Sequence, residues 1–177
     1  MLLLHSKKNI ILGKGVRIDN KTRLITNGKK LKIGSNVYLR SRSQGYHAGM
    51  PFSTTILLDN KEATCLIGDN CRINGVYIHA KSKIVIGSNT VIAAGVNILD
   101  SNGHEVYSEN RTQGRDIPKE IHIGNNVWIG LNSIILKGTH IGDNSIVAAG
   151  SVVKGVFPCN VIVQGNPAVI VNEICTI

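Results

Sequence analysis

The sequence predicts an all-β protein, a parallel β-helix shaped as a triangular prism, and three observations support this fold class. Aliphatic residues recur at every sixth position over a long stretch, and small or β-branched residues occupy the fifth place of each hexad. Gly or Asn then fills turns such as "IGNN", "IGDN" and "IGSN", and no long helical stripe with caps is found. The aliphatic anchors are Ile123, Ile129, Ile135, Ile141, Val147 and Val153, and the fifth-place residues are Val127, Ser133, Thr139, Ser145 and Ser151.

A period of six fits neither an α-helix, whose apolar positions recur at three and four, nor a long alternating strand. It fits a short strand, a turn and another short strand, with the anchors pointing inward and Gly or Asn in left-handed turn conformations. Three hexads make one coil of about eighteen residues, and stacked coils pair as parallel strands about 4.8 Å apart. About seven such coils fit into the chain, and the ends of the stack need capping.

The same register returns upstream, with slips between its segments. Two stretches break it, Arg40 to Asn60 and about 103–120, and we expect both to be loop insertions. No linker composition divides the chain, so we expect a single domain over residues 1–177 with a short C-terminal tail. The upstream anchors are Ile86, Ile92, Ile98, Ile67, Ile73, Leu12, Ile18 and Leu24.

The formal net charge of +9 is concentrated near the N-terminus, where residues 1–50 contain eleven Lys and Arg residues and one acidic residue, Asp19. Such a field attracts polyanions, although a solvated surface that keeps the protein in solution explains it equally well. Nucleic acid is the less favoured partner, because the chain has only two Phe, one Trp and four Tyr residues and no stacking motif.

Other features of the sequence favour a cytoplasmic location. No run of eighteen apolar residues predicts a transmembrane segment, and the opening "MLLLHSKKN" is too short and too soon basic for a signal peptide. The cysteines form neither a CxxC pair nor a dense framework, so we expect reduced thiols at Cys65, Cys71, Cys159 and Cys175.

The segment "IHIGNNVWIGLNSIILKGTHIGDNSIVAAGSVVKGVFPCNVIVQGNPAVIV" resembles the C-terminal half of the hexapeptide-repeat acyltransferases, which include galactoside, maltose and capsular-polysaccharide O-acetyltransferases. The resemblance is strongest over residues 67–171 and extends weakly to residue 12. It implies a left-handed coil, although left-handed crossovers run against the general rule. It also implies acetyl-CoA as cosubstrate, no metal, and a homotrimer with active sites between protomers.

The segment "DSNGHE", Asp100 to Glu105, stands where the six-residue step from Ile98 lands on a polar residue, His104. We expect the chain to leave the prism there in a charged, turn-prone loop. On spacing alone, a surface insertion with a solvated His explains the segment equally well. The resemblance implies that His104 is the general base, which takes the proton of an acceptor hydroxyl during direct transfer of the acetyl group from acetyl-CoA.

The chemistry around His104 suggests further roles. Asp100, Glu105 or a backbone carbonyl would orient the imidazole ring. By the resemblance, the backbone N–H of Leu131 stabilises the oxyanion of the tetrahedral intermediate. The resemblance also implies that Trp128 shields the thioester from water, and the alternative is a structural aromatic on a face of the prism. The residues expected to bind the acceptor are Asn74, Asn102 and Glu105, and Asn74 also fits a turn position.

For CoA, the resemblance implies a groove along the stacked coils, with backbone amides near Ala149 beside the pantetheine arm. Relatives often carry "TKD" after "GSVV", whereas this chain reads "GSVVKGVFP", so that Lys154 is displaced by one place. Val169 stands where some relatives have an Arg, and Lys154 or Lys137 would replace the missing phosphate contacts. The residues expected to bind CoA are Trp128, Leu131, Ala149 and Lys154.

The other irregular segment, Arg40 to Asn60, contains Tyr46 and His47. A simple surface loop is the favoured interpretation of this segment, and a contribution of the two residues to acceptor binding is the alternative. No part of the family pattern covers it.

Three other functions are alternatives for this sequence. Catalytic zinc needs three converging imidazoles, whereas His122 and His140 are eighteen residues apart and should stack on successive coils facing solvent; His79 and His104 show no metal-ligand spacing. A non-catalytic scaffold would keep the repeat without the loop, the His and the Trp. An N-acetyltransferase acting on an antibiotic or a nucleotide-linked amino sugar stays an alternative. The basic N-terminal coils favour a carbohydrate acceptor that is anionic, such as a capsule or lipopolysaccharide glycan.

Overall fold

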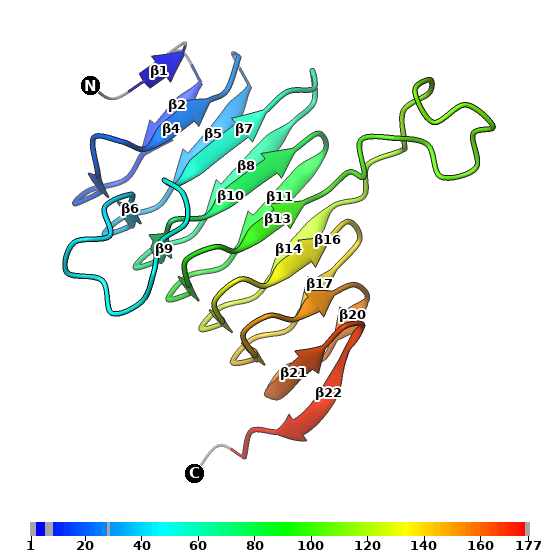
Figure 1. The fold of residues 1–177 in the computed structure, drawn as a ribbon. Helices are drawn as coiled ribbons and strands as arrows, with labels where there is room; N and C mark the ends of the chain where they lie inside the picture. Colours follow the sequence, from blue (N-terminus) through cyan, green and yellow to red (C-terminus); the bar gives the residue numbers. More distant parts are fainter. Residues whose placement is uncertain (1–2, 6–8, 28, 176–177) are drawn as a thin grey trace.

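The computed structural model describes residues 3–5, 9–27 and 29–175, which form a left-handed parallel β-helix (Figure 1). Each coil adds one strand in turn to three parallel sheets, which we name A, B and C. Sheet A contains β1 (Leu3–His5), β4 (Arg23–Ile25), β7 (Thr55–Leu58), β10 (Tyr77–Ala80), β13 (Asn97–Leu99), β16 (Ile134–Leu136) and β19 (Val152–Val153). Sheet B contains β2 (Ile10–Leu12), β5 (Lys30–Ile33), β8 (Thr64–Ile67), β11 (Lys83–Ile86), β14 (Ile121–Ile123), β17 (His140–Ile141) and β20 (Val156–Phe157).

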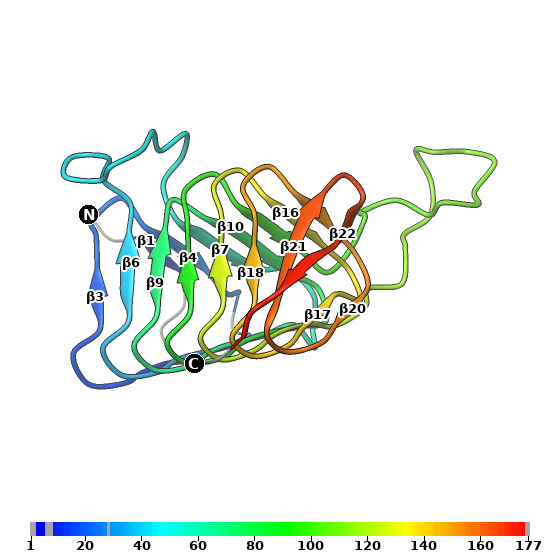
Figure 2. The same ribbon diagram turned by 90° about the horizontal axis from the view of Figure 1, so that it is seen from below.

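Sheet C completes the prism and carries the chain's last strand. It contains β3 (Arg17–Ile18), β6 (Tyr38–Arg40), β9 (Arg72–Asn74), β12 (Val91–Ile92), β15 (Trp128–Ile129), β18 (Ile146–Val147), β21 (Val161–Gly165) and β22 (Ala168–Glu173). Strand β22 runs antiparallel to β21 and covers the end of this sheet (Figure 2). The described strands therefore form seven coils, as the six-residue period predicts.

The prism interior is filled by the aliphatic anchors. The six anchors from Ile123 to Val153 are at most 3% exposed. At the corners, the hydroxyl groups of the fifth-place residues bond to backbone carbonyls of their own and the next coil: Ser133 Oγ donates to Gly130 O at 3.0 Å and to Ala148 O at 3.1 Å. These hydroxyls satisfy carbonyl groups that have little access to water. The prediction for Leu12 is wrong, because its side chain is 45% exposed at the first coil, where the stack ends.

The corner between sheets B and C is a row of asparagines in the left-handed conformation, as the "IGNN" and "IGDN" motifs predict. Their φ angles are 53° to 60°, and their side-chain amides bond to one another from coil to coil, for instance Asn144 Nδ2 to Asn160 Oδ1 at 3.1 Å. Asn tolerates this conformation better than most residues with a Cβ. The row consists of Asn36, Asn70, Asn89, Asn126, Asn144 and Asn160.

Two loops leave the prism, both at predicted breaks but with different bounds. One connects β6 to β7 over residues 41–54, so the predicted insertion at 40–60 is too long: Thr55–Leu58 is a strand of sheet A. The other connects β13 to β14 over residues 100–120, three residues earlier than predicted, and projects far from the prism (Figures 1 and 2). Its ends are joined where Lys119 N–H donates to Asp100 O at 2.9 Å.

In the described residues, no helix is long and apolar enough to cross a membrane. The four cysteines are free thiols, as expected, and burial raises the pKa of Cys65 to about 12. A thiol with such a pKa is not a nucleophile at neutral pH.

Candidate active site

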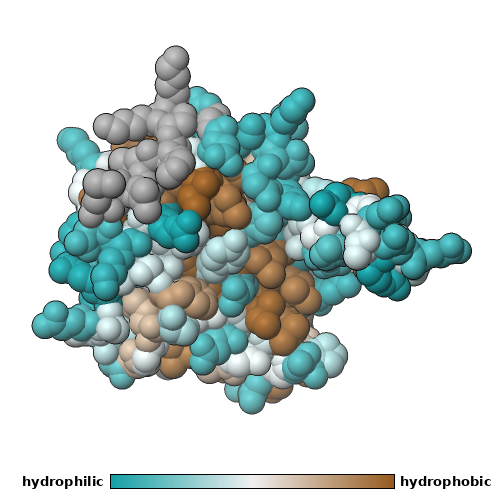
Figure 3. All heavy atoms as spheres, turned by 45° about the horizontal axis from the view of Figure 1, so that its top comes forward, coloured by the Kyte–Doolittle hydropathy of each residue, from teal (hydrophilic) through white to brown (hydrophobic). Residues whose placement is uncertain are grey.

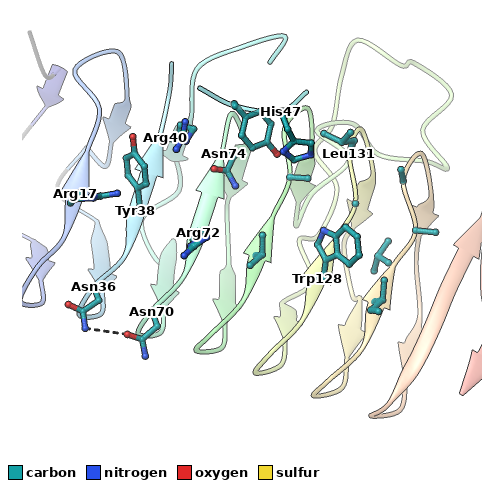
Figure 4. Close-up of a pocket in the computed structure, with 18 of the residues that line it drawn as sticks. Arg17, Asn36, Tyr38, Arg40, His47, Asn70, Arg72, Asn74, Trp128 and Leu131 are labelled. Carbon is teal, nitrogen blue, oxygen red and sulfur yellow. Dashed lines mark hydrogen bonds between the residues drawn. The ribbon is translucent and has the colours of Figure 1, made fainter. Parts of the chain in front are cut away.

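The outer face of sheet C is hollowed into a groove of about 1040 Å³ that runs across the stacked strands (Figure 4). Side chains that precede an anchor form one row along it, because the parallel register pairs them from coil to coil. This row is Arg17, Tyr38, Arg72, Val91, Trp128 and Ile146. The groove therefore has a basic half over β3, β6 and β9, formed by Arg17, Tyr38, Arg40 and Arg72, and an apolar half over β12, β15 and β18.

Four of the predicted site residues lie together in this groove: Asn74, Trp128, Leu131 and Ala149. Trp128 is 54% exposed, so its ring is available to a ligand rather than buried in the prism. Asn74 is only 6% exposed and donates from Nδ2 to Ile92 O at 2.9 Å. This bond fixes the amide and leaves its Oδ1 without a partner in the described part of the chain.

Three backbone amides follow one another at the corner between sheets C and A. The N–H of Ala94 donates to the hydroxyl of Tyr46 at 3.3 Å. The N–H groups at the equivalent places in the next two coils, Leu131 and Ala149, have no acceptor among the described residues. Gly130 brings these coils close together: a Cβ there would lie 2.5 Å from Ala149 N. Both amides belong to the groove lining and are available to a ligand.

The other predicted site residues lie at a different corner of the prism. His104, Asn102 and Glu105 are exposed on loop 100–120, and Lys154 is exposed between β19 and β20. All four belong to the corner between sheets A and B, and none lines the groove. Within one chain, the structure therefore separates His104 from Trp128 and Leu131 by the width of sheet A.

The turn that carries His104 is fixed at its base by Asp116. The Asp116 carboxylate accepts hydrogen bonds from Ser101 Oγ at 2.6 Å, from the N–H of Asn102 at 2.7 Å, and from Lys137 Nζ at 2.6 Å. Burial raises the pKa of Asp116, but the bonds from Lys137, Ser101 and Asn102 outweigh it and lower the pKa to about 2. Lys137 also donates to Ile117 O, so it is engaged here and does not serve as the predicted substitute for a phosphate contact.

Of the three groups that the sequence offers to orient His104, the structure argues against Asp100. Asp100 is completely buried and accepts hydrogen bonds from the N–H groups of Lys81 at 2.8 Å and Ser82 at 2.7 Å. Burial raises the pKa of this carboxyl group. Asp100 therefore closes a turn between coils. Glu105 packs against Gly114 and, in the described residues, makes no hydrogen bond to His104.

His122 and His140 lie where the sequence places them. Their rings stack on successive strands of sheet B at 4.8 Å, and His122 Nε2 lies 2.9 Å from Glu120 Oε2. The described residues contain no group of three or more His, Cys, Asp or Glu side chains arranged to hold a metal ion.

Several groove residues were not predicted from the sequence. Tyr46 and His47, for which the sequence favours a simple surface loop, line the groove. Figure 4 shows His47 between Asn74 and Leu131. Of the arginines in the basic half, Arg17 and Arg40 enter the sequence analysis only as N-terminal charge, and Arg72 does not enter it. A signal for two of them exists: Arg17 and Arg72 directly precede an anchor, as Trp128 does, and this place in the third strand of each coil faces the groove.

Comparisons with known proteins agree with this architecture. Residues 120–154 match the family model described as the hexapeptide repeat of succinyl-transferase. A galactoside O-acetyltransferase of Escherichia coli is 44% identical over 91 residues, which are 51% of this chain and 44% of that protein. The solved structure of a galactoside acetyltransferase in complex with coenzyme A is 28% identical, with a TM-score of 0.62, and the match covers 93% of this chain and 65% of that one.

These matches make the chain similar to the hexapeptide-repeat acetyltransferases. A second relative, the putative lipopolysaccharide biosynthesis O-acetyl transferase WbbJ of E. coli, is 35% identical over 115 residues, which are 59% of this chain and 58% of that protein. The chain spans about half the length of the curated relatives it matches.

Proposed function

We propose that this protein transfers the acetyl group of acetyl-CoA to a hydroxyl group of a sugar. The observation that carries the proposal is the apolar half of the groove, where the exposed ring of Trp128 lies beside two backbone amides, at Leu131 and Ala149, that have no acceptor in the described chain. An amide-containing arm such as pantetheine can accept from such donors and pack on such a ring. The similarity to a galactoside acetyltransferase that binds coenzyme A supports this choice.

The reaction is a direct transfer. Neutral His104 takes the proton of the acceptor hydroxyl as its oxygen attacks the thioester carbon. The N–H of Leu131 stabilises the oxyanion of the tetrahedral intermediate, a contribution of a few kcal/mol in other acyl transfers. The C–S bond then breaks, and the imidazolium returns the proton to the CoA thiolate. The products are the acetyl ester and CoA, and no metal takes part.

The proposed site needs two copies of the chain. His104 lies at the corner between sheets A and B, whereas Leu131 lies at the corner between sheets C and A. Three copies around a three-fold axis bring the first corner of one protomer to the second corner of its neighbour. The outward side chains of sheet A include the partly exposed Leu57, Leu99 and Leu136. Figure 3 shows apolar side chains gathered on the prism beside the hydrophilic projecting loop, as a self-associating surface would have.

The acceptor is a carbohydrate, for which we propose a bacterial surface polysaccharide or its precursor. Asn74 supplies a fixed acceptor oxygen inside the groove, and Asn102 and Glu105 would approach from the loop of the neighbouring protomer. Lys154, which lies at the same corner as the loop, would reach CoA phosphate in the same way. Four free thiols support a reducing compartment, the cytoplasm.

The activity test follows thiol release from acetyl-CoA with a panel of oligosaccharides, antibiotics and amino sugars as acceptors. We expect a carbohydrate to stimulate release and the product to be an ester, which mild base hydrolyses. An amide product from an amino sugar would support the N-acetyltransferase alternative. If no acceptor stimulates release, the transferase proposal is wrong.

A mixing experiment tests the shared site. His104→Ala and Trp128→Ala proteins should each be inactive alone, whereas trimers formed from both after unfolding and refolding together should regain activity. In a random mixture about a quarter of the sites would combine an intact His104 with an intact Trp128 from the neighbour. Light scattering that finds a monomer, or mixtures without regained activity, would contradict the two-copy site.

A further inference from the structure

The basic half of the groove takes no part in the proposed acetyl transfer. Strand spacing of about 4.8 Å places Arg72, two strands from Trp128, about 10 Å away from it, and Arg17, four strands away, about 19 Å. No Asp or Glu side chain is part of the groove lining in the described chain. A ligand that extends along this lining from Trp128 toward the first coils therefore meets arginine side chains and no carboxylate.

The arginines of this half have no carboxylate partner among the described residues. Asp19, the acidic residue nearest to Arg17 in the sequence, is already engaged: Arg42 lies 3.2 Å from its Oδ1, the Tyr38 hydroxyl donates to it at 3.1 Å, and the N–H of Ser41 donates at 2.9 Å. Asp69, which is nearest to Arg72, accepts the N–H of Ser35 at 2.6 Å. The Nε atom of Arg40 is buried and has no hydrogen-bond partner in the described part. A buried donor without a partner is costly unless a ligand supplies the acceptor.

Aromatic rings hold these guanidinium groups in place. The Cζ atom of Arg17 lies 4.4 Å from the centre of the Tyr38 ring, and that of Arg40 lies 5.1 Å from the same centre and 5.8 Å from that of Tyr46. Cation–π contact at these distances orients a guanidinium without neutralising it. Guanidinium groups held close together repel one another, and an anionic ligand stabilises them by offsetting this repulsion.

We propose that the basic half binds the carboxylate or phosphate groups of an acidic oligosaccharide, which is the acceptor of the transfer reaction. This inference rests on the proposed function for the identity of the ligand as an acceptor. Because the charges lie about 10 to 19 Å from Trp128, they contact sugar units other than the one that is acetylated. The acceptor is then a chain rather than a single sugar.

CoA also carries phosphate groups, but the proposed position of its pantetheine arm places them at the other end of the groove. The two free amides at Leu131 and Ala149 lead from Trp128 toward the last coils, away from the basic half. A pantetheine arm that follows them carries the CoA phosphates in the same direction. The basic half is left for the acceptor.

The first test measures binding without acetyl-CoA, so that it does not depend on the transfer activity. Calorimetry would compare acidic oligosaccharides containing uronic acid, sialic acid or phosphate with carboxyl-reduced or dephosphorylated forms of the same chains. We expect the acidic forms to bind at least about tenfold more tightly, with an affinity that falls as salt concentration rises. The matched variants are Arg72→Gln in the groove and Arg23→Gln on sheet A, which is exposed and lies outside the groove.

Arg72→Gln should weaken binding of the acidic chain about tenfold, Arg72→Lys should restore part of it, and Arg23→Gln should leave it unchanged. Equal binding of acidic and neutral chains, equal losses in Arg72→Gln and Arg23→Gln, or no binding of any acidic chain would each overturn the proposal. Acidic binding that depends on Arg72 supports it even if no acetyl transfer is found, in which case the proposed function alone fails.

Steady-state kinetics then separate the two sources of anionic groups. With an active acceptor, Arg72→Gln should raise the KM for the acidic chain about tenfold and leave the KM for acetyl-CoA unchanged. A raised KM for acetyl-CoA, with an unchanged KM for the acceptor, would mean that the basic half holds CoA phosphate, and would overturn the proposal.

Discussion

The two loops that leave the prism behave in opposite ways. Loop 41–54 folds back over sheet C, where the Tyr46 hydroxyl accepts the N–H of Ala94 and His47 lines the groove. Loop 100–120 projects from another corner, and its Tyr107 is 94% exposed. Each loop carries an imidazole, and each has an ion pair with a buried carboxylate at its base, Arg42–Asp19 in loop 41–54 and Lys137–Asp116 in loop 100–120. One loop therefore completes the chain's own groove, and the position of the other fits the proposal that it serves a neighbouring copy.

The largest expected effect is a difference in kcat between variants of the two loop histidines, His104 and His47. His104→Ala should lower kcat by about 10²- to 10⁴-fold, the usual contribution of a general base. His47→Ala should lower kcat less than about tenfold, because His47 contacts the acceptor in the groove without taking its proton. Stopped-flow or steady-state measurement of CoA release from the purified proteins gives the kcat of each variant. The reverse order of effects would transfer the catalytic role to His47 and to a single chain.

The next effect concerns the base of loop 100–120. Asp116→Asn should lower kcat about tenfold with little change in the KM for acetyl-CoA, since Lys137 loses its carboxylate and the turn before His104 loosens. Hydrogen exchange of the loop amides should become faster. Glu109→Gln is the control, because it removes an exposed carboxylate from the same loop. Unchanged exchange in Asp116→Asn would show that the ion pair does not hold the loop.

The same carboxylate predicts a dependence of stability on acid. Its folded-state pKa of about 2 lies below the ordinary value of 3.8, so the unfolded chain binds the proton more tightly. The stabilisation is complete above about pH 4 and is lost as the pH falls toward 2, by about 2 kcal/mol in all. Urea unfolding of the wild type and of Asp116→Asn between pH 5 and 2 measures it. The difference between the two proteins should shrink by that amount, and a constant difference would refute the assignment.

The smallest effect concerns loop 41–54. Tyr46→Phe removes the hydroxyl that accepts the N–H of Ala94 and should weaken the closed position of the loop by about 1 kcal/mol. Exchange of the Ala94 amide should become faster by the corresponding factor, with kcat nearly unchanged. Tyr107→Phe, in the projecting loop, is the matched control. Equal exchange in both variants would mean that the loop does not rest on the groove.

The repeat made most of the fold predictable. An anchor every six residues forces a short strand and a corner, so the seven coils, the buried hydroxyls and the Asn turns all follow from local pattern. Trp128, Leu131 and Ala149 meet for the same reason, because each has a fixed place in its hexad. Leu12 has the right spacing but no coil beneath it to bury its side chain, which the period alone does not reveal.

The contacts of the loops were not predictable in this way. Tyr46 bonds to an amide 48 residues away, and Lys137 bonds to a carboxylate 21 residues away. Neither pair has a spacing that the repeat dictates, because a loop path is decided by tertiary contacts. Arg17 and Arg72 are the intermediate case, because they occupy the same place before an anchor as Trp128. Their position therefore predicts the row that they form, whereas a count of charges does not.

The asparagine row also has a lower end. Gly15 occupies the equivalent corner one coil before Asn36. Its φ of 68° is also left-handed, but it has no side-chain amide that could bond to Asn36. At the other end, β22 turns back along β21 and covers the last edge of sheet C. A stack of identical rungs is otherwise a template to which further chains add without limit, as in fibrils. Strand β22 blocks such addition at the last edge of sheet C, whereas the first coil exposes Ile11 and Leu12, so the two ends of the prism are unequal as templates.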